Sequence, residues 1–248
     1  SCKTFDECFE IANNDNDIKT MIPESNKTTG NIGIEYLIFK YRLNIYAEHF
    51  FKISHNLLGV KGCKLEDIKE VYSHAQALSQ SSIFIKKNNL NGQIRADTAG
   101  SAKYVSDTKN KTKAAIASIL SAEIYDLEIL KKDVQDNKEN FTRFLLLGKD
   151  IVQPENNKKS YITSFLFKLK SKPAALYSAL QGMAINGVNM IKLQSFPEKN
   201  SFSSYFFLCE VEGHIENQKI KNSLEDLNYH CEDMSVLGVF EADKLRKK

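Results

Sequence analysis

The sequence predicts an α/β protein built from two domains, and three observations support this. Over the first 149 residues, short apolar segments of strand type alternate with segments of helical periodicity. From residue 161 onward, the order becomes strand, helix, strand, strand, helix, strand. The length of 248 residues also exceeds the usual domain size of about 100–150 residues, so two domains are expected.

The first domain is expected to begin on a helix. Thr4 and Glu7 have the spacing of a capping box, and an apolar helical pattern follows over 5–12. Further helices are expected at 33–41, 75–87, 99–106 and 118–126. Strands are expected at 17–22, 43–54 with a continuation to 59, 68–72, 93–96, 113–117, 127–134 and 140–148. This interleaving predicts a largely parallel sheet, whose ligands lie where strands are followed by helices.

A polar segment without periodicity, GKDIVQPENNKKS at 148–160, is expected to contain the linker. Beyond it we expect strands at 161–170, 188–196, 202–212 and 235–240, and helices at 173–186 and 216–227. Pro173 suits the first turn of its helix, and Gly187 suits the position just after the helix ends. The order βαββαβ predicts a ferredoxin-like unit.

Composition argues against several classes of function. The net charge is +3 and the lysines are dispersed among acids, so no nucleic-acid-binding face is expected. No apolar run approaches the ~18 residues of a membrane span, and no leader peptide opens the chain. The cysteines are odd in number and lack C-x-x-C spacing, which argues against disulfides and a metal site and favours a reducing cytoplasm.

Four segments stand where a strand ends or is followed by a helix: PESNKTTG at 23–30, SHAQALSQ at 73–80, DTAGSAKY at 97–104 and NFTRF at 140–144. Ser73 and Thr98 each precede a predicted helix and offer a hydroxyl beside free backbone N–H groups. Such helix ends bind carboxylates or phosphates. The alternative is ordinary N-capping, because Ser and Thr are preferred caps of any helix.

The segment NFTRFLLLG places a threonine and an arginine at the start of a predicted strand. Arg143 is one of only four arginines, and it is suited to bidentate binding of a substrate carboxylate; a structural salt bridge is the alternative. His74 is a hydrogen-bonding candidate, whereas His49 and His55 are interpreted as structural. No Ser-His-Asp spacing, glycine-rich phosphate loop or H-E-x-x-H motif occurs. Spacing alone therefore predicts a small-anion site and no particular reaction.

NFTRFLLL, SHAQAL, DTAGSA and the P-x-x-N-x-x-x-G of Pro23, Asn26 and Gly30 together resemble prephenate dehydratase, and 161–248 resembles the ACT domain that follows it. The resemblance implies a catalytic domain at 1–149 folded like a type II periplasmic binding protein and lacking the usual N-terminal strand. It further implies a linker at 150–160 and a regulatory domain at 161–248. The active site is then expected between two lobes.

The resemblance implies conversion of prephenate to phenylpyruvate, with loss of water and carbon dioxide, in L-phenylalanine biosynthesis. Thr142 is implied to be catalytic, by hydrogen-bonding or protonating the leaving hydroxyl. The implied substrate-binding residues are Asn26, Ser73, His74, Gln76, Thr98, Ala99, Gly100, Arg143 and Phe144. No metal or organic cofactor is implied, and a homodimer or tetramer is expected.

The sequence departs from the family pattern at several motifs. Ser25 and Lys27 stand where the family commonly has an acid and a serine, and Ala75 replaces a proline. The implied effector-binding residues are Ala174, Ala175, Leu176, Gln194 and Ser195. Ala174 replaces a glycine that lets a ligand's backbone approach, and Phe196 removes a charge. Feedback by L-phenylalanine is therefore expected to be weaker than is usual in the family.

Two alternatives to an active enzyme remain. The first is a catalytically impaired homologue that binds a small anion or an aromatic amino acid, which the altered 23–30 loop favours. The second is a periplasmic-type solute-binding protein, which would carry a leader and lack the T-R-F motif. Formation of phenylpyruvate from prephenate distinguishes these possibilities.

Overall fold

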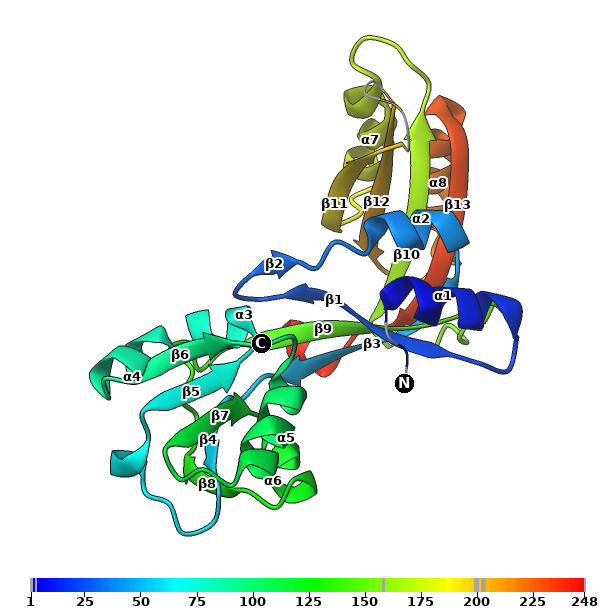
Figure 1. Cartoon of the computed structure of the whole chain (residues 1–248). Coiled ribbons are helices and arrows are strands. Elements are labelled where there is room, and N and C mark those ends of the chain that lie inside the picture. Colours follow the sequence, from blue (N-terminus) through cyan, green and yellow to red (C-terminus); the bar gives the residue numbers. More distant parts are fainter. Residues whose placement is uncertain (1, 3, 158, 199–200, 202–203, 248) are drawn as a thin grey trace. The chain divides into compact units, whose positions relative to one another are not determined.

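The computed structural model describes residues 2, 4–157, 159–198, 201 and 204–247 (Figure 1). It consists of two compact units: unit 1 is Ser1–Phe50 with Arg143–Lys248, and unit 2 is Phe51–Thr142. The chain passes from one unit to the other within β3 (Asn44–Lys52) and within β9 (Phe141–Gly148). The boundaries of these units differ from the predicted division at the linker 150–160, because the N-terminal segment packs with the C-terminal part.

Unit 2 contains a five-stranded sheet of order β6-β5-β7-β4-β8. Its strands are β4 (Asn56–Gly59), β5 (Glu70–Ser73), β6 (Asn91–Ile94), β7 (Lys113–Ala117) and β8 (Glu128–Lys131). β5 pairs with β6 and β7 in parallel, whereas β4 pairs antiparallel with β7 and β8. The predicted parallel sheet is thus limited to three strands. Helical crossovers join those three, while β4 and β8 adjoin the segments by which the chain enters and leaves the unit.

Helices cover both faces of this sheet. They are α3 (Ala75–Ser79), α4 (Ser82–Lys87), α5 (Thr98–Thr108) and α6 (Ile119–Ile124), with a 3₁₀ turn η1 (Leu65–Asp67). One core cluster joins Leu57 and Ile116 to Leu78 of α3, and another joins Leu58 and Ala115 to α5 and α6. Because neighbouring strand residues face opposite sides, β4 and β7 are apolar at successive positions.

The helix predicted over 75–87 is broken in two. The carboxylate of Asp136 accepts from the Ile83 N–H at 3.1 Å and from the Ser82 hydroxyl at 3.0 Å. Acceptors at a helix start satisfy N–H groups that have no partner within the helix. A residue more than fifty positions away therefore gives α4 its own N-terminus.

The N-terminal part of unit 1 consists of α1 (Phe5–Asn14), β1 (Thr20–Asn26), β2 (Gly30–Asn31) and α2 (Glu35–Tyr41). As predicted, the Thr4 hydroxyl accepts from the Glu7 N–H at 3.1 Å at the start of α1. The strand predicted at 17–22 instead begins at Thr20, and its burial alternates along its length. With β3 and β9 these strands form a sheet of order β2-β1-β9-β3.

The C-terminal part has the predicted βαββαβ order. Its elements are β10 (Tyr161–Leu169), α7 (Ala175–Ile185), β11 (Met190–Pro197), β12 (Tyr205–Glu212), α8 (Gln218–His230) and β13 (Cys231–Glu241), followed by η2 (Lys244–Lys247). The sheet order is β11-β12-β10-β13, and the paired strands are antiparallel. Residues 202 and 203 of the predicted strand at 202–212 lie outside the described residues.

Unit 1 has a core that both of its chain segments share. Phe9, Ile38 and Leu145 pack in one cluster with Leu166 and Phe206 of the C-terminal sheet. The opposite face of that sheet packs against α7 and α8. Contact between the two segments is close enough that a Cβ atom on Gly238 would lie 2.3 Å from the Ile45 carbonyl oxygen.

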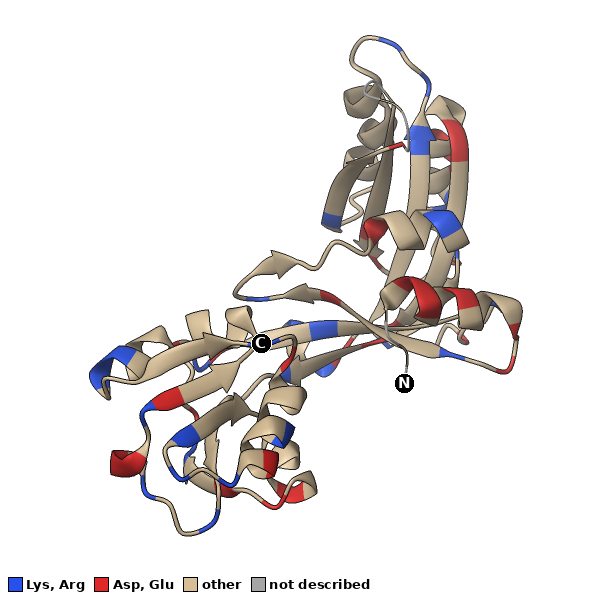
Figure 2. Cartoon of the chain, viewed as in Figure 1, with Lys and Arg blue, Asp and Glu red and all other residues tan. Residues whose placement is uncertain are grey.

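The surface agrees with the charge pattern of the sequence. Basic and acidic residues are interspersed over each unit (Figure 2). None of the helices in the described part of the chain is long and apolar enough to span a bilayer.

Candidate anion-binding site

The carboxyl ends of β5, β6 and β7 lie at one edge of the unit 2 sheet, because these three strands are parallel. α3 and α6 begin directly after β5 and β7, and α5 begins a few residues after β6, with His74, Ser118 and Asp97 as the respective N-caps. The positive ends of three helices therefore meet the same edge, which is the kind of place where α/β proteins bind anions.

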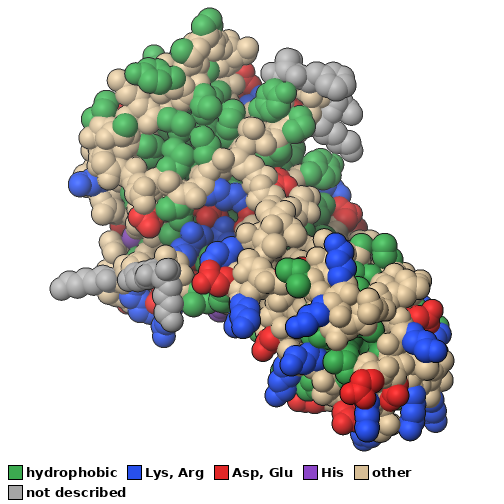
Figure 3. All heavy atoms as spheres, turned by 90° about the vertical axis from the view of Figure 1, so that its left-hand side faces the viewer, with side chains coloured by type: hydrophobic (Ala, Val, Ile, Leu, Met, Phe, Trp, Pro, Cys, Tyr) green, Lys and Arg blue, Asp and Glu red, His purple; other side chains and the backbone are tan. Residues whose placement is uncertain are grey.

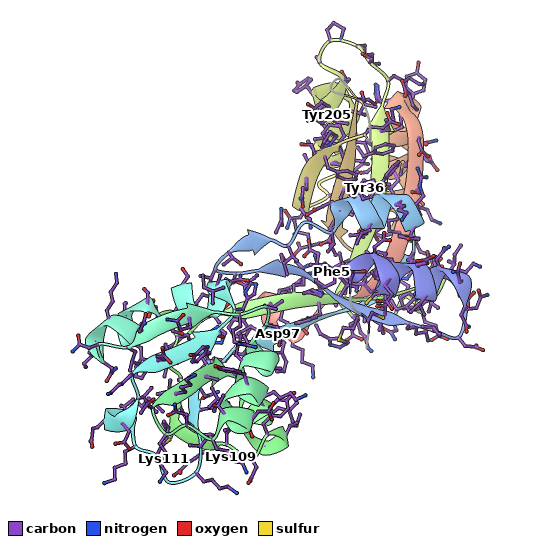
Figure 4. All side chains as sticks on the ribbon, in the orientation of Figure 1. Phe5, Tyr36, Asp97, Lys109, Lys111 and Tyr205 are labelled. Carbon is purple, nitrogen blue, oxygen red and sulfur yellow. The ribbon has the colours of Figure 1, made fainter. Side chains whose placement is uncertain are left out.

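At the start of α5, the cap is one residue earlier than the sequence suggested. Asp97 (Figure 4) precedes the helix, and its Oδ1 accepts from the Gly100 N–H at 2.5 Å. Thr98, predicted to be the capping hydroxyl, is the first helical residue, and the neighbouring Ala99 is exposed. An aspartate is favoured here, because its charge also interacts with the helix dipole.

Ser73 is not the capping hydroxyl of α3. It is the last residue of β5, it is fully buried, and its Oγ donates to the Ile116 carbonyl oxygen at 2.6 Å. The capping prediction was wrong because Ser73 still belongs to β5, where it pairs with Ile94 of β6, and the next residue, His74, is the cap of α3.

His74 takes the capping role at α3 instead. Its Nδ1 accepts from the Gln76 N–H at 3.3 Å. In the neutral ring the proton then resides on Nε2, which makes Nε2 a donor. His74 and Gln76 are both exposed at the sheet edge. They therefore remain candidates for hydrogen bonds to a ligand.

A hollow of about 230 Å³ opens at the same edge, and Ile94, Arg95, Ala96, Asp97 and Gly100 line it. The Arg95 guanidinium lies 4.2 Å from the centroid of the Tyr104 ring. In the part of the chain that the structure describes, no carboxylate oxygen lies within 4 Å of a guanidinium nitrogen of Arg95. Sequence reasoning missed Arg95, although its position at the end of a predicted strand was a usable signal.

Thr142 and Arg143 are the second and third residues of β9, and both side chains are buried. Neighbouring residues of a strand project to opposite faces, so the hydroxyl and the guanidinium cannot point into one pocket. Phe144 is half-buried and shares the face of Thr142 by the same alternation.

The Arg143 guanidinium is held by three carboxylates. Nε donates to Glu48 Oε2 at 2.7 Å, Nη1 donates to Glu24 Oε2 at 3.2 Å, and Nη2 donates to Glu210 Oε1 at 2.9 Å. Burial alone would lower the pKa of Arg143, but the charges of Glu210 and Glu48 raise it overall. The salt-bridge alternative is therefore the observed one: the three glutamates hold the N–H groups that the prediction assigned to a substrate carboxylate.

Asn26 ends β1 and is buried. Its Oδ1 accepts from the N–H groups of Thr28 and Thr29 at 3.0 and 3.1 Å. This is the geometry by which an asparagine holds a turn. The side chain thus stabilises the turn between β1 and β2, in unit 1.

The predicted effector-binding residues lie in the C-terminal part of unit 1. Ala174 precedes α7 with φ +57°, the left-handed region that favours glycine, and Ala175 and Leu176 begin the helix. On β11, Gln194 Nε2 donates to Glu35 Oε1 at 2.6 Å, and Ser195 is exposed. Gln194 therefore faces α2 and lines a hollow of about 440 Å³ together with Arg143 and Lys192.

Within the described residues, no group of three or more histidine, cysteine, aspartate or glutamate side chains is arranged to hold a metal ion. What the structure brings together is a set of N–H donors, a histidine and an arginine. The fold is that of an α/β protein, and this sheet edge is its candidate site for a small organic anion.

A family model for prephenate dehydratase matches residues 1–152. A bifunctional N-acyl-homoserine lactone acylase/prephenate dehydratase from Komagataeibacter europaeus is 34% identical over 248 residues, covering 100% of this chain and 88% of that protein. A prephenate dehydratase from Methanocaldococcus jannaschii is 34% identical, covering 96% of this chain and 86% of its own. Arogenate dehydratase 2 of Petunia hybrida is 34% identical, and the match spans 98% of this chain but 65% of the plant protein.

Two solved structures have the same fold. One is described as a novel type of quorum-quenching acylase, with a TM-score of 0.91, 34% identity, and coverage of 99% of this chain and 89% of the other. A prephenate dehydratase from Arthrobacter aurescens, in complex with L-Phe, has a TM-score of 0.86, 24% identity, and coverage of 97% and 80%. The chain belongs to the prephenate dehydratase family.

Proposed function

We propose that the chain catalyses the decarboxylating dehydration of prephenate to phenylpyruvate. The observation that carries this proposal is the position of Thr142, the threonine of the family's T-R-F motif, in the unit that also holds the anion-binding edge. Membership of the family supports the reaction type.

The chemistry makes two demands on the site. Prephenate carries two carboxylates, one of which leaves as carbon dioxide, and the electron pair of that C–C bond enters the ring as the hydroxyl departs. The ring becomes aromatic, which favours the reaction. The enzyme must therefore hold a dianion and stabilise a departing hydroxide, which leaves as water once it gains a proton.

We assign the holding role to Arg95, to the N–H groups at the start of α5, and to His74 and Gln76. Arg95 replaces Arg143 in this role because its guanidinium is exposed at the hollow. A bidentate guanidinium matches a carboxylate well. Asp97 adds a negative charge to the same hollow, but its carboxylate already accepts from the Gly100 N–H.

Thr142 is assigned to the leaving hydroxyl. A threonine hydroxyl is a weak general acid, because proton donors work best when their pKa lies near the operating pH. Its contribution is therefore mainly a hydrogen bond to the developing negative charge. Phe144, on the same face of β9, supplies an apolar surface beside the ring.

The test is to incubate the purified chain with prephenate and to follow phenylpyruvate by its ultraviolet absorbance. Parallel reactions contain arogenate, which has an amino group in place of the keto group and would give phenylalanine, and an N-acyl-homoserine lactone, since names of relatives include both activities. In these reactions the loss of each substrate is followed by chromatography. Phenylpyruvate from prephenate supports the proposal. If no substrate reacts, the catalytically impaired homologue is favoured. If only arogenate or only the lactone is turned over, that compound and not prephenate is the substrate.

We also propose the family's domain organisation: a type II periplasmic-binding-protein-like catalytic domain at 1–149, a linker at 150–160 and an ACT domain at 161–248. The two crossings of the chain, within β3 and β9, support a two-lobed catalytic domain. For the ACT domain, the support is the βαββαβ order and the strand order β11-β12-β10-β13.

We propose that a second copy of this chain associates with the C-terminal sheet. β11 is an edge strand, and Tyr177, Ile185 and Leu193 are exposed on α7 and β11. Hydrophobic side chains gather over this part of unit 1 (Figure 3). Sedimentation of the full chain tests this proposal, and a monomer at micromolar concentration would contradict it. L-phenylalanine is proposed to act weakly, because Ala174 adds a methyl where the family has glycine.

A further inference from the structure

A buried group of charged residues, the unit 1 charge cluster, surrounds Arg143. Its carboxylates are Glu24, Glu48 and Glu210, and its cations are Arg143, Arg246 and Lys192. The three glutamate side chains are 0–2% exposed. Three negative and three positive charges balance, which is the condition under which a buried charge cluster is tolerated.

The cluster joins the two sheets of unit 1. Glu24, Glu48 and Arg143 lie on β1, β3 and β9, which belong to one sheet. Glu210 lies on β12 of the C-terminal sheet. The Nη2–Oε1 distance of 2.9 Å between Arg143 and Glu210 therefore connects the strand of the T-R-F motif to the C-terminal sheet.

Arg143 is the main partner of Glu210. Arg246 reaches Glu210 Oε2 only at 3.4 Å, and it contacts Glu48 more closely, at 2.5 and 2.7 Å. The Arg143 side chain is only 5% exposed. If the Glu210 carboxylate is removed, Nη2 of Arg143 loses its acceptor, while Glu48 and Glu24 still hold Nε and Nη1. The expected response is a shift of Arg143 with the fold kept.

We propose that Glu210 is a positioning residue for catalysis: it orients Arg143 and thereby sets the position of the adjacent Thr142 hydroxyl. The proposal rests on the function assigned to Thr142. Thr142 and Arg143 share a peptide bond within a strand, so a displacement of one backbone moves the other. Misplacement of a catalytic group by about 1 Å can cost about 10²-fold in rate, which is why such a contact matters.

The experiment measures kcat and KM for prephenate in the full chain carrying Glu210→Ala, Glu210→Gln or Glu212→Ala. Glu212 lies on the same strand but is exposed and bonds Asn189 at 2.6 Å, so Glu212→Ala is the matched control. For Glu210→Ala we expect kcat to fall about tenfold with little change in KM. Glu210→Gln retains an acceptor for Nη2 and should recover most of the lost rate, and the control should match the wild type.

A second measurement separates positioning from a general structural role. In a Thr142→Ala background, Glu210→Ala should have little further effect on kcat, because the group that Glu210 positions is gone. If Thr142→Ala and Glu210→Ala instead lower kcat by independent factors that multiply in the double variant, the proposal is overturned. An unchanged kcat in Glu210→Ala alone would also overturn it.

Nuclear magnetic resonance of the Thr142 methyl group gives a readout that does not depend on turnover. The signal should move in Glu210→Ala and stay in place in Glu212→Ala. If the wild type makes no phenylpyruvate, the function assigned to Thr142 fails, and this signal alone then decides whether Glu210 positions Thr142. A signal that does not move overturns the positioning inference in either case.

Discussion

Arg143 and Glu210 form a buried ion pair, 67 residues apart in sequence, with 2.9 Å between Nη2 and Oε1. This pair explains why an arginine follows the threonine of the T-R-F motif. Thr142 and Arg143 project to opposite faces of β9, and Arg143 anchors the strand in unit 1. Because Arg143 serves as this anchor, we expect a different cation to bind the substrate.

The first prediction concerns Thr142. Thr142→Ala should lower kcat by about 10²–10³, the usual cost of removing one donor to a developing negative charge. Thr142→Ser retains the hydroxyl and should keep most of the activity. Steady-state kinetics with prephenate, together with circular dichroism of both variants, provides the check. Equal activity of wild type and Thr142→Ala would remove Thr142 from the mechanism.

The second prediction concerns Arg95. Arg95→Gln should raise KM for prephenate about tenfold or more, because a charged hydrogen bond is worth about 1.5–3 kcal/mol. Arg95→Lys should give a KM between those of the wild type and Arg95→Gln, since lysine retains the charge but lacks the paired N–H donors of a guanidinium. Lys103→Gln, on the exposed side of α5, is the control for net charge. An unchanged KM in Arg95→Gln would contradict the assigned role.

The third prediction separates structure from binding at Ser73. Its hydroxyl bonds the Ile116 carbonyl inside the sheet, so Ser73→Ala should reduce the free energy of unfolding by about 1 kcal/mol. KM for prephenate should remain unchanged. Urea unfolding and steady-state kinetics measure the two quantities, with the exposed Ser79→Ala as control. A large rise in KM without loss of stability would restore the binding role.

The fourth prediction concerns the left-handed Ala174. Ala174→Gly should increase the free energy of unfolding by about 1 kcal/mol, because glycine adopts positive φ without the steric cost that alanine carries. Ala175→Gly, at the first helical position, should decrease it, because glycine loses more conformational freedom on folding than alanine does. Thermal unfolding of the matched pair tests the opposite signs. Calorimetry with L-phenylalanine should show tighter binding to Ala174→Gly than to the wild type.

The fifth prediction is a pH dependence that arises from His55. Burial lowers the pKa of His55, while its hydrogen bond to Gln80 at 2.9 Å opposes the shift. The unfolded chain therefore binds this proton more readily, and stability falls as the pH drops below about 6.5. Comparing urea unfolding at pH 7.5 and 5.5 should show a smaller pH effect in His55→Gln than in the wild type. His49, which is exposed, serves as the control position.

Glu48 affects stability in a different pH window. Burial raises its pKa, but the hydrogen bond from Arg246 and the charge of Arg143 lower it overall. Stabilisation by Glu48 is therefore complete above the ordinary glutamate pKa of about 4.3, and it is lost only as the pH falls further. The comparison at pH 7.5 and 5.5 thus lies above the pH range in which the stabilisation by Glu48 changes.

By itself, the sequence determined most of the order of the helices and strands, although not β2 (Gly30–Asn31), together with the cap of α1 by Thr4 and the sheet edge at which several site residues meet. These features follow from periodicity, capping and strand order, which depend on residues close together in the chain. Only the tertiary structure decided the partners of Arg143, since Glu24, Glu48 and Glu210 lie 119, 95 and 67 positions away. It likewise decided the break between α3 and α4, where Asp136 approaches from 54 positions beyond Ser82. Ion pairs and caps between distant segments depend on how the chain folds back on itself, and local patterns carry no record of that.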